Sequence, residues 1–334
     1  NNTYDVEDET NGVLIWNANN VVFNQCTINN VHGSGIAVFS SNSLKVNNNS
    51  ISNTSSRGIL GHRIENMETS SNTISNTGVF TNTFFINSRK TSLSSSYMTL
   101  YGDGIESSAR KFIALNNKIY NPGRIGISHD LAIDLKYLKS EAVVKSNYIE
   151  INNKIINNSN PPAGMWFEQS HDVNVSENKI VIKKSGSKIV TGIRFYDITG
   201  KVTCKNNTID AQTYNLNLNE AIGIFEPLSA TFDITDNKMI GKFTNAITVS
   251  YEKKNAYLYK LSIINNDIKA SSSTVKKALD VQVYSKQDMP KEINFSNNKI
   301  NMIKENHFKI GYFGDYSKKV NNSKYKIQNN TYVK

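Results

Sequence analysis

The amino-acid sequence predicts an all-β solenoid of about 11 coils of 23–32 residues, in which short strands stack in parallel on the coil before. Three observations support this prediction. A unit containing asparagine recurs along the chain, a unit with a small residue lies between its copies, and the spacing of both fits one coil. The 334 residues include 16 Tyr and 14 Phe, enough for a buried core. No apolar run approaches the ~18 residues of a membrane-spanning helix.

The asparagine unit has the pattern apolar, any, apolar, any, any, Asn, any, apolar, as in Leu44, Val46, Asn49 and Ile51. Its last apolar residue recurs at positions 28, 51, 74, 119, 149, 180, 209, 239, 268, 300 and 332. Asparagine stands two places earlier in ten of the eleven copies, and Cys26 takes that place in the first. Asparagine tolerates the left-handed backbone of a sharp corner, and its amide can bond to the same amide in the next coil. We therefore expect an asparagine ladder.

The second unit is a small residue followed by an apolar one, and it falls between the asparagine units. Its copies are Gly12-Val13, Gly35-Ile36, Gly58-Ile59, Gly104-Ile105, Gly126-Ile127, Gly164-Met165, Gly192-Ile193, Gly223-Ile224, Ala246-Ile247 and Ala278-Leu279. The shortest coils divide into segments of 8, 7 and 8 residues. Each coil should therefore hold three short strands joined by tight turns. Such a unit buries its apolar side only by stacking on its neighbours.

The repeats run through the whole chain, so we expect one domain over residues 1–334. Between Ile74 and Ile105 the spacing is 31 residues where 8 suffice, and the excess of 23 equals one coil. Residues 75–104 are therefore either an insertion or a degenerate coil. Neither terminal coil is preceded or followed by a capping segment, although solenoids normally cover their ends. We expect a domain excised from a longer chain, or ends covered by partner subunits, for example in a homotrimer.

Alternate residues of a strand face outward, so the first and third residues after each small-apolar pair should form two outer columns. Between Glu106 and Phe225 these columns gather acidic, aromatic and basic residues on successive coils. They are Glu106, Asp130 and Glu168 beside Trp166, Arg194, Tyr196 and Phe225. Phe225 is assigned to the column of first residues, next to Arg194. Asp130 and Glu168 are assigned to adjacent places in the column of third residues.

This grouping is what cleavage of a glycosidic bond requires. One carboxyl group must be protonated and another ionised, and exposed aromatic rings stack on sugars. We expect Glu106, Asp130 and Glu168 to supply the acid and the base, with one pKa raised because two acids are adjacent. Arg194 and Tyr196 would orient the substrate, and Trp166 and Phe225 would stack on it. His129 is also a candidate binding residue, although the register turns it inward or places it at a turn, which favours a structural role.

The phased Gly-Ile and Asn-x-Ile units resemble the right-handed, single-stranded parallel β-helix of the pectate-lyase-like superfamily, from Gly12 to Tyr332. The resemblance implies that fold and a long carbohydrate held against the side of the helix. The polygalacturonase motifs are absent, with Gly61-His62-Arg63 the nearest fragment, and no calcium-lyase set of aspartates is visible. The acids on one flank are most similar in arrangement to those of phage tailspike and polysaccharide depolymerase domains.

Charge and cysteine content limit the partners. The net charge of +10 is concentrated in residues 251–334, which have 16 Lys against 7 acids, whereas residues 1–250 have 22 Lys and Arg against 21 acids. No RNA-binding motif accompanies the excess, so we expect no nucleic-acid partner. Cys26 and Cys204 should lie six coils apart, ~29 Å, too far for a disulfide. Their spacing is not that of a metal site, and we expect no metal and no other cofactor.

We therefore expect an extracellular enzyme, secreted or on a virion tail, that binds and hydrolyses a bacterial capsule, O-antigen or exopolysaccharide in a groove on the side of the helix. Two alternatives stay open. A polysaccharide lyase would use Arg194, Tyr196 or His129 to remove a proton beside a uronate. A non-catalytic glycan-binding or structural solenoid would present the Lys-rich last quarter to an anionic surface.

Overall fold

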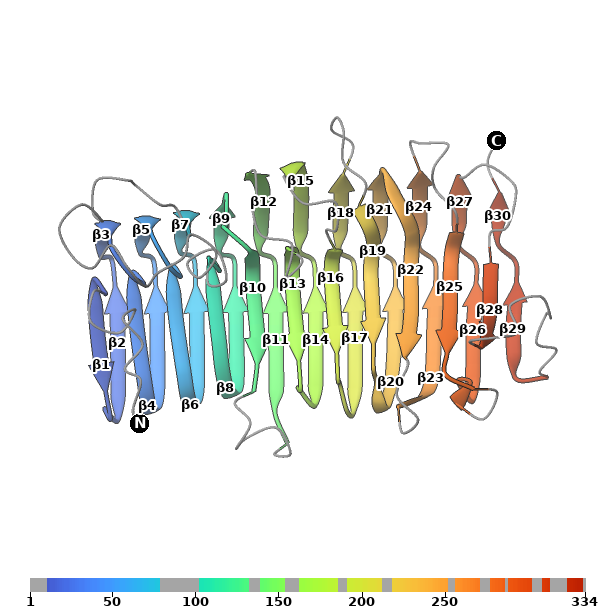
Figure 1. The fold of residues 1–334 in the computed structure, drawn as a ribbon, viewed down its shortest axis with the longest axis horizontal. Coiled ribbons are helices and arrows are strands. Elements are labelled where there is room, and N and C mark those ends of the chain that lie inside the picture. The colour runs from blue at the N-terminus through green and yellow to red at the C-terminus, as the bar shows by residue number, and fades with distance from the viewer. Residues whose placement is uncertain are drawn as a thin grey trace, which may run out of the picture.

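The computed structural model is a right-handed parallel β-helix whose axis runs along the longest dimension of the molecule (Figure 1). It describes residues 11–78, 102–131, 139–153, 162–185, 191–211, 218–251, 256–270, 277–285, 288–301, 308–312 and 323–332. In these ranges every strand pairing is parallel, which a single winding direction produces. The same ranges contain no helix with the length and apolar character needed to cross a membrane.

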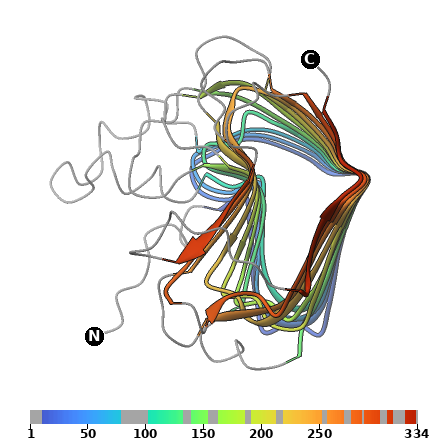
Figure 2. The same cartoon turned by 90° about the vertical axis from the view of Figure 1, so that its right-hand side faces the viewer.

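Each coil has three sides, which appear when the molecule is viewed along its axis (Figure 2). The first face follows the small-apolar pair. Its strands are β1 (Val13–Trp16), β4 (Ile36–Asn47), β6 (Ile59–Ser70), β8 (Ile105–Leu115), β10 (Ile125–Asp130), β13 (Ala163–Glu168), β16 (Thr191–Tyr196), β19 (Leu218–Phe225), β22 (Phe243–Tyr251), β25 (Lys277–Val283) and β28 (Phe308–Tyr312).

The second face continues the same sheet, and β4, β6 and β8 bend across both faces. Its own strands are β2 (Asn20–Asn24), β11 (Glu141–Lys145), β14 (Asp172–Ser176), β17 (Lys201–Lys205), β20 (Leu228–Thr235), β23 (Tyr257–Ile264), β26 (Glu292–Ser296) and β29 (Tyr325–Gln328). The third face is a separate sheet of β3 (Thr27–Val31), β5 (Ser50–Thr54), β7 (Thr73–Thr77), β9 (Lys118–Tyr120), β12 (Tyr148–Asn153), β15 (Lys179–Ser185), β18 (Thr208–Ala211), β21 (Lys238–Gly241), β24 (Asp267–Ala270), β27 (Lys299–Asn301) and β30 (Thr331–Tyr332). Among the described residues this sheet has eleven strands, one for each coil, which confirms the predicted number of about 11 coils.

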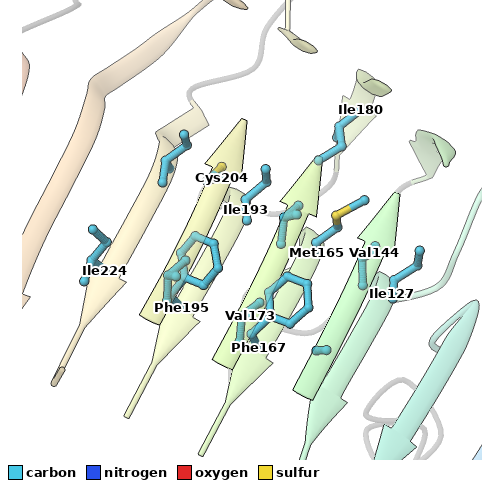
Figure 3. Packing of buried hydrophobic residues seen from close by; sticks show 14 of the residues in the cluster. Ile127, Val144, Met165, Phe167, Val173, Ile180, Ile193, Phe195, Cys204 and Ile224 are labelled. Atoms are coloured by element: carbon cyan, nitrogen blue, oxygen red, sulfur yellow. The ribbon is translucent and has the colours of Figure 1, made fainter. Parts of the chain in front are cut away.

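The core is one apolar column system that runs through the inside of the coils (Figure 3). Like residues stack on like, because each coil repeats the apolar positions of its neighbour. The rings of Phe167 and Phe195, for example, stack with centroids 5.5 Å apart. Cys204 is buried in this core and Cys26 is half-buried, and both are free thiols, as predicted. Burial raises the pKa of the Cys204 thiol to about 12.

The predicted asparagine ladder is present and starts at Cys26. In each step one amide donates to the next; Asn178 Nδ2, for example, donates to Asn207 Oδ1 at 2.9 Å, and the Asn178 backbone N–H donates to the same oxygen at 3.0 Å. The left-handed conformation was assigned to the wrong residue, however. It belongs to the residue before each ladder position, such as Asn206 with φ of 57°. This explains the asparagine pairs, in which the first residue turns the corner and the second bonds to the next coil.

The long spacing after Ile74 is not a coil of the stack. Strand β6 pairs directly with β8, and β7 pairs directly with β9, so the coils on the two sides of residues 79–101 are immediate neighbours. The segment itself lies outside the described residues. Of the two alternatives, the pairing therefore favours an insertion over a degenerate coil within the ladder.

Candidate functional site

Apart from His129, the predicted site residues lie on the first face, on the outer side of β8, β10, β13, β16 and β19, which we call the acidic flank. The pairing of the strands places Ser128 beside Glu106 and Trp166, and Trp166 beside Arg194. In the other column, Asp130 pairs with Glu168, and Glu168 pairs with Tyr196. These neighbours are those that the strand alternation predicted.

The assignment of Phe225 to the column of Arg194 was wrong. Arg194 pairs with Gly223, whereas Phe225 pairs with Tyr196. The small-apolar pair of this coil is Ala221-Ile222, two residues before the predicted Gly223-Ile224. A Cβ placed on Gly192 would lie 2.5 Å from the carbonyl oxygen of Ala221, which shows how closely these two positions approach. Phe225 therefore continues the column of Asp130, Glu168 and Tyr196.

Asp130 and Glu168 form the centre of the flank. The Asp130 side chain is accessible to solvent, yet its pKa is raised to about 7. Desolvation by the surrounding protein is the largest cause, and the charges of Glu168 and Glu106 add to it, against an opposing effect of Arg124. Burial also raises the pKa of Glu168. Trp166 and Arg194 oppose that rise, because the indole N–H of Trp166 donates to Oε2 of Glu168 at 3.0 Å and Arg194 is cationic. Of the two carboxyl groups, Glu168 has the contacts that favour ionisation.

Arg194 lies between two aromatic rings. The centre of its guanidinium group is 4.3 Å from the ring centroid of Trp166 and 4.5 Å from that of Phe225, and the Tyr196 ring is 5.7 Å away. Cation–π contacts of this kind hold a guanidinium group in one place. Burial lowers the pKa of Arg194. The two rings predicted to stack on sugars thus each contact Arg194.

Glu106 has a different environment from the other two predicted acids. Arg57 donates to it from Nε at 2.7 Å and from a terminal nitrogen at 3.4 Å. Burial alone would raise the pKa of Glu106, but the charges of Arg57 and Arg124 outweigh it and lower the pKa. Glu106 is therefore an ionised, paired carboxylate, which removes it as a candidate proton donor.

Three buried residues of the flank escaped the sequence analysis. Asp103 accepts two bonds from Arg124, at 2.8 and 2.7 Å, and one from the Ser128 hydroxyl at 2.7 Å. Arg57 and Glu220 are also buried. Glu220 accepts a 2.8 Å bond from the Thr191 hydroxyl, and burial raises its pKa although Arg194 opposes the rise.

These three residues share one position in the repeat, directly before the small residue. Arg57 precedes Gly58, Asp103 precedes Gly104 and Glu220 precedes Ala221. A column of polar residues at this position was readable from the sequence. The analysis considered only residues after the small-apolar pair and so passed over it.

His129 does not belong to the flank. Its side chain is 0% exposed, points into the core, and stacks on Phe112 with ring centroids 5.3 Å apart. Burial lowers its pKa to about 4, against a slight opposing effect of the Ser107 backbone. Neither ring nitrogen has a hydrogen bond of normal geometry within the described ranges. His129 therefore cannot contact a glycan on the outer face, and the inward orientation considered from the sequence is the observed one.

Comparison with known proteins bears on the fold alone. A family model described as "right handed beta helix region" matches residues 1–128, so the chain is similar to that family from its start into β10. No curated protein and no solved structure matches the chain. A right-handed β-helix suits glycan-acting proteins in general. In the part of the chain that the structure describes, no three His, Cys, Asp or Glu residues gather as a metal site.

Proposed function

We propose that this protein is an extracellular polysaccharide depolymerase that hydrolyses a bacterial surface glycan at the acidic flank. The observation that carries the proposal is the pairing of Asp130, with a pKa of about 7, with Glu168 on the next coil. Two carboxyl groups of different ionisation, adjacent to each other, are what glycoside hydrolysis uses.

The environments of the two groups divide the roles between them. Asp130, protonated in a large fraction of molecules near neutral pH, would donate a proton to the glycosidic oxygen as the bond to the leaving sugar breaks. Glu168, held by Trp166 and close to Arg194, would act in its ionised form on the anomeric carbon. Neighbouring coils are ~4.8 Å apart. Carboxyl groups ~5 Å apart are typical of retaining enzymes, so carboxyl groups that follow the spacing of their strands would give retention of configuration.

The other residues of the flank would position the substrate. Arg194, held between Trp166 and Phe225, has a buried Nε without a hydrogen-bond partner among the described residues. Tyr196 lies beside Glu168 in the same column. In contrast, Glu106, Asp103 and their arginines form closed ion pairs that support the wall of the flank.

The test uses a panel of purified capsular, O-antigen and exopolysaccharides, with release of reducing ends as the readout. For the glycan that is cleaved, Glu168→Gln and Asp130→Asn should each reduce the rate by roughly 10²–10⁴-fold. Glu141→Gln, an exposed acid of β11 on the second face, is the matched control and should keep the wild-type rate. Full cleavage by Glu168→Gln, or no cleavage of any glycan on the panel, would refute the proposal.

The lyase alternative is favoured by one observation, the lowered pKa of Arg194, because a proton acceptor must lose its own proton first. His129 is removed from this alternative by its burial. A lyase leaves an unsaturated sugar that absorbs ultraviolet light, whereas a hydrolase leaves none. The absorbance of the products therefore separates the two reactions.

A further inference from the structure

Two exposed tyrosines lie on β23 of the second face (Figure 1), one coil beyond β20, the strand that follows β19 of the acidic flank. Tyr257 and Tyr259 of β23 are 37% and 50% exposed, and the residue between them, Leu258, is buried. Alternation along the strand places both rings on the outer side. Large exposed aromatic side chains that gather on one face of a soluble protein commonly mark a binding surface.

A local irregularity of the sheet presents these rings. Strand β20 pairs Leu228 with Tyr257, Ala230 with Leu258 and Thr231 with Lys260, so Ser229 and Tyr259 have no partner in the register. Ser229 has φ of 62°, a left-handed conformation. Bulges of this kind turn a side chain out of the regular ladder.

A lysine side chain, Lys291, lies over both tyrosine rings. The ammonium group of Lys291 lies 5.1 Å from the ring centroid of Tyr259 and 5.7 Å from that of Tyr257. Lys260 of β23 and Lys326 of β29 also lie on the second face, and Lys324 directly precedes β29. Lys324 and Lys326 are exposed. Glu292 of β26 pairs with Lys260 in the sheet, and its carboxylate is 3.7 Å from the Lys260 ammonium group. We call the two tyrosines and four lysines the basic aromatic patch.

We propose that the basic aromatic patch is a second, non-catalytic binding site for an anionic polysaccharide. The tyrosine rings would pack on the apolar faces of sugars, and the lysines would pair with carboxylate or sulfate groups along the polymer. The patch contains four of the 16 lysines of residues 251–334. The inference rests on the proposed function only in taking a glycan as the polymer, because the patch and the acidic flank share no residue.

The experiment measures equilibrium binding to alginate, a polyuronate, with dextran as a neutral polymer. We expect alginate to bind more tightly than dextran and to weaken as salt rises, since salt screens exposed charges. The double variant Tyr257→Ala/Tyr259→Ala and the double variant Lys291→Gln/Lys324→Gln should each weaken alginate binding by about tenfold at low salt. Unchanged thermal unfolding shows that a variant is folded.

Lys179→Gln is the matched control. Lys179 lies 5.9 Å from the Tyr148 ring on the third face, so it makes the same type of contact outside the patch, and its variant should bind alginate as the wild type does. Equal loss in this control, no loss in the patch variants, or tighter patch-dependent binding to oligo(dT) or to phosphatidylglycerol vesicles than to alginate would each overturn the inference.

The outcomes separate this inference from the proposed function. Cleavage at the acidic flank together with unchanged alginate binding in the patch variants would refute the second site alone. Patch-dependent binding by a protein that cleaves no glycan would refute the hydrolase and leave the second site in place. For short oligosaccharides that reach only the flank, the patch variants should cleave at the wild-type rate.

Discussion

Arg57 and Glu106, 49 residues apart in the sequence, are joined by a 2.7 Å bond from Nε to Oε2 at the edge of the acidic flank. The side chain of Arg57 is almost fully buried, and that of Glu106 is mostly buried. Removing one member of such a pair leaves the other charge uncompensated. The relationship makes Glu106 part of the support for the flank, distinct from the pair of Asp130 and Glu168.

We therefore predict that Glu106→Gln reduces cleavage far less than Glu168→Gln does. The variant keeps the shape of the side chain and its contact with Arg57 but loses the charge. Because the charge of Glu106 contributes to the raised pKa of Asp130, the rate should change by a shift of its pH profile toward lower pH. Rates over a range of pH for the two variants check this. A loss for Glu106→Gln as large as that for Glu168→Gln would make Glu106 a catalytic residue.

A second prediction concerns the titration of Asp130. Its pKa of about 7 in the folded protein lies above the ordinary value of 3.8, so the folded state holds this proton more tightly. Its contribution to stability is present below pH 3.8 and is lost as pH rises through about 7. Asp130→Asn should abolish that loss, and unfolding by urea at several pH values measures it.

Carboxyl NMR of the Glu168→Gln variant tests the cause of the shift. Without the Glu168 charge the pKa of Asp130 should fall below about 7, but it should stay above 3.8, because desolvation is the larger cause. An unchanged pKa would mean that the two groups do not interact, which would contradict the proposed pairing of acid and base.

The repeat made the fold predictable, because Asn49 and its equivalents fix the phase of every coil with a bond that recurs at one position. Which residues form the small-apolar pair of a given coil was harder to predict. Ala221-Ile222 and Gly223-Ile224 both fit the small-apolar pattern, and a shift of two residues keeps the same side chains inside. Only the pairing with β16 distinguishes them, and it moved Phe225 to the other column.

The buried ion pairs could not be predicted for another reason. Arg57 and Asp103 precede the small residue, between two strands, where strand alternation no longer says which way a side chain points. Their partners are set by which coils touch, and the insertion at residues 79–101 hides that Arg57 and Glu106 belong to adjacent coils. The inward orientation of His129, in contrast, followed from alternation alone.

His129 gives a third prediction. Its pKa falls from 6.5 to about 4 on folding because the fully buried ring is desolvated. Folding stability should therefore be complete above pH 6.5 and decrease by about 3 kcal/mol as pH falls through 4. His129→Phe, which keeps an aromatic ring against Phe112, should remove most of this acid dependence and leave glycan cleavage unchanged. Lost cleavage in a folded His129→Phe protein would restore a catalytic role for the imidazole.

The asparagine ladder gives the last prediction. Asn178 donates through Nδ2 to Asn207 Oδ1 at 2.9 Å and to the Val144 carbonyl at 2.8 Å, and its own Oδ1 accepts from Asn147 at 2.9 and 3.0 Å. Asn178→Ala leaves several buried groups without partners, at roughly 1–3 kcal/mol each. We expect the free energy of unfolding to fall by about 3–5 kcal/mol. Asn174→Ala, at an exposed position of β14, should change it by less than about 0.5 kcal/mol. Similar urea midpoints for the two variants would mean that the ladder follows from the stacking of the coils and does not stabilise it.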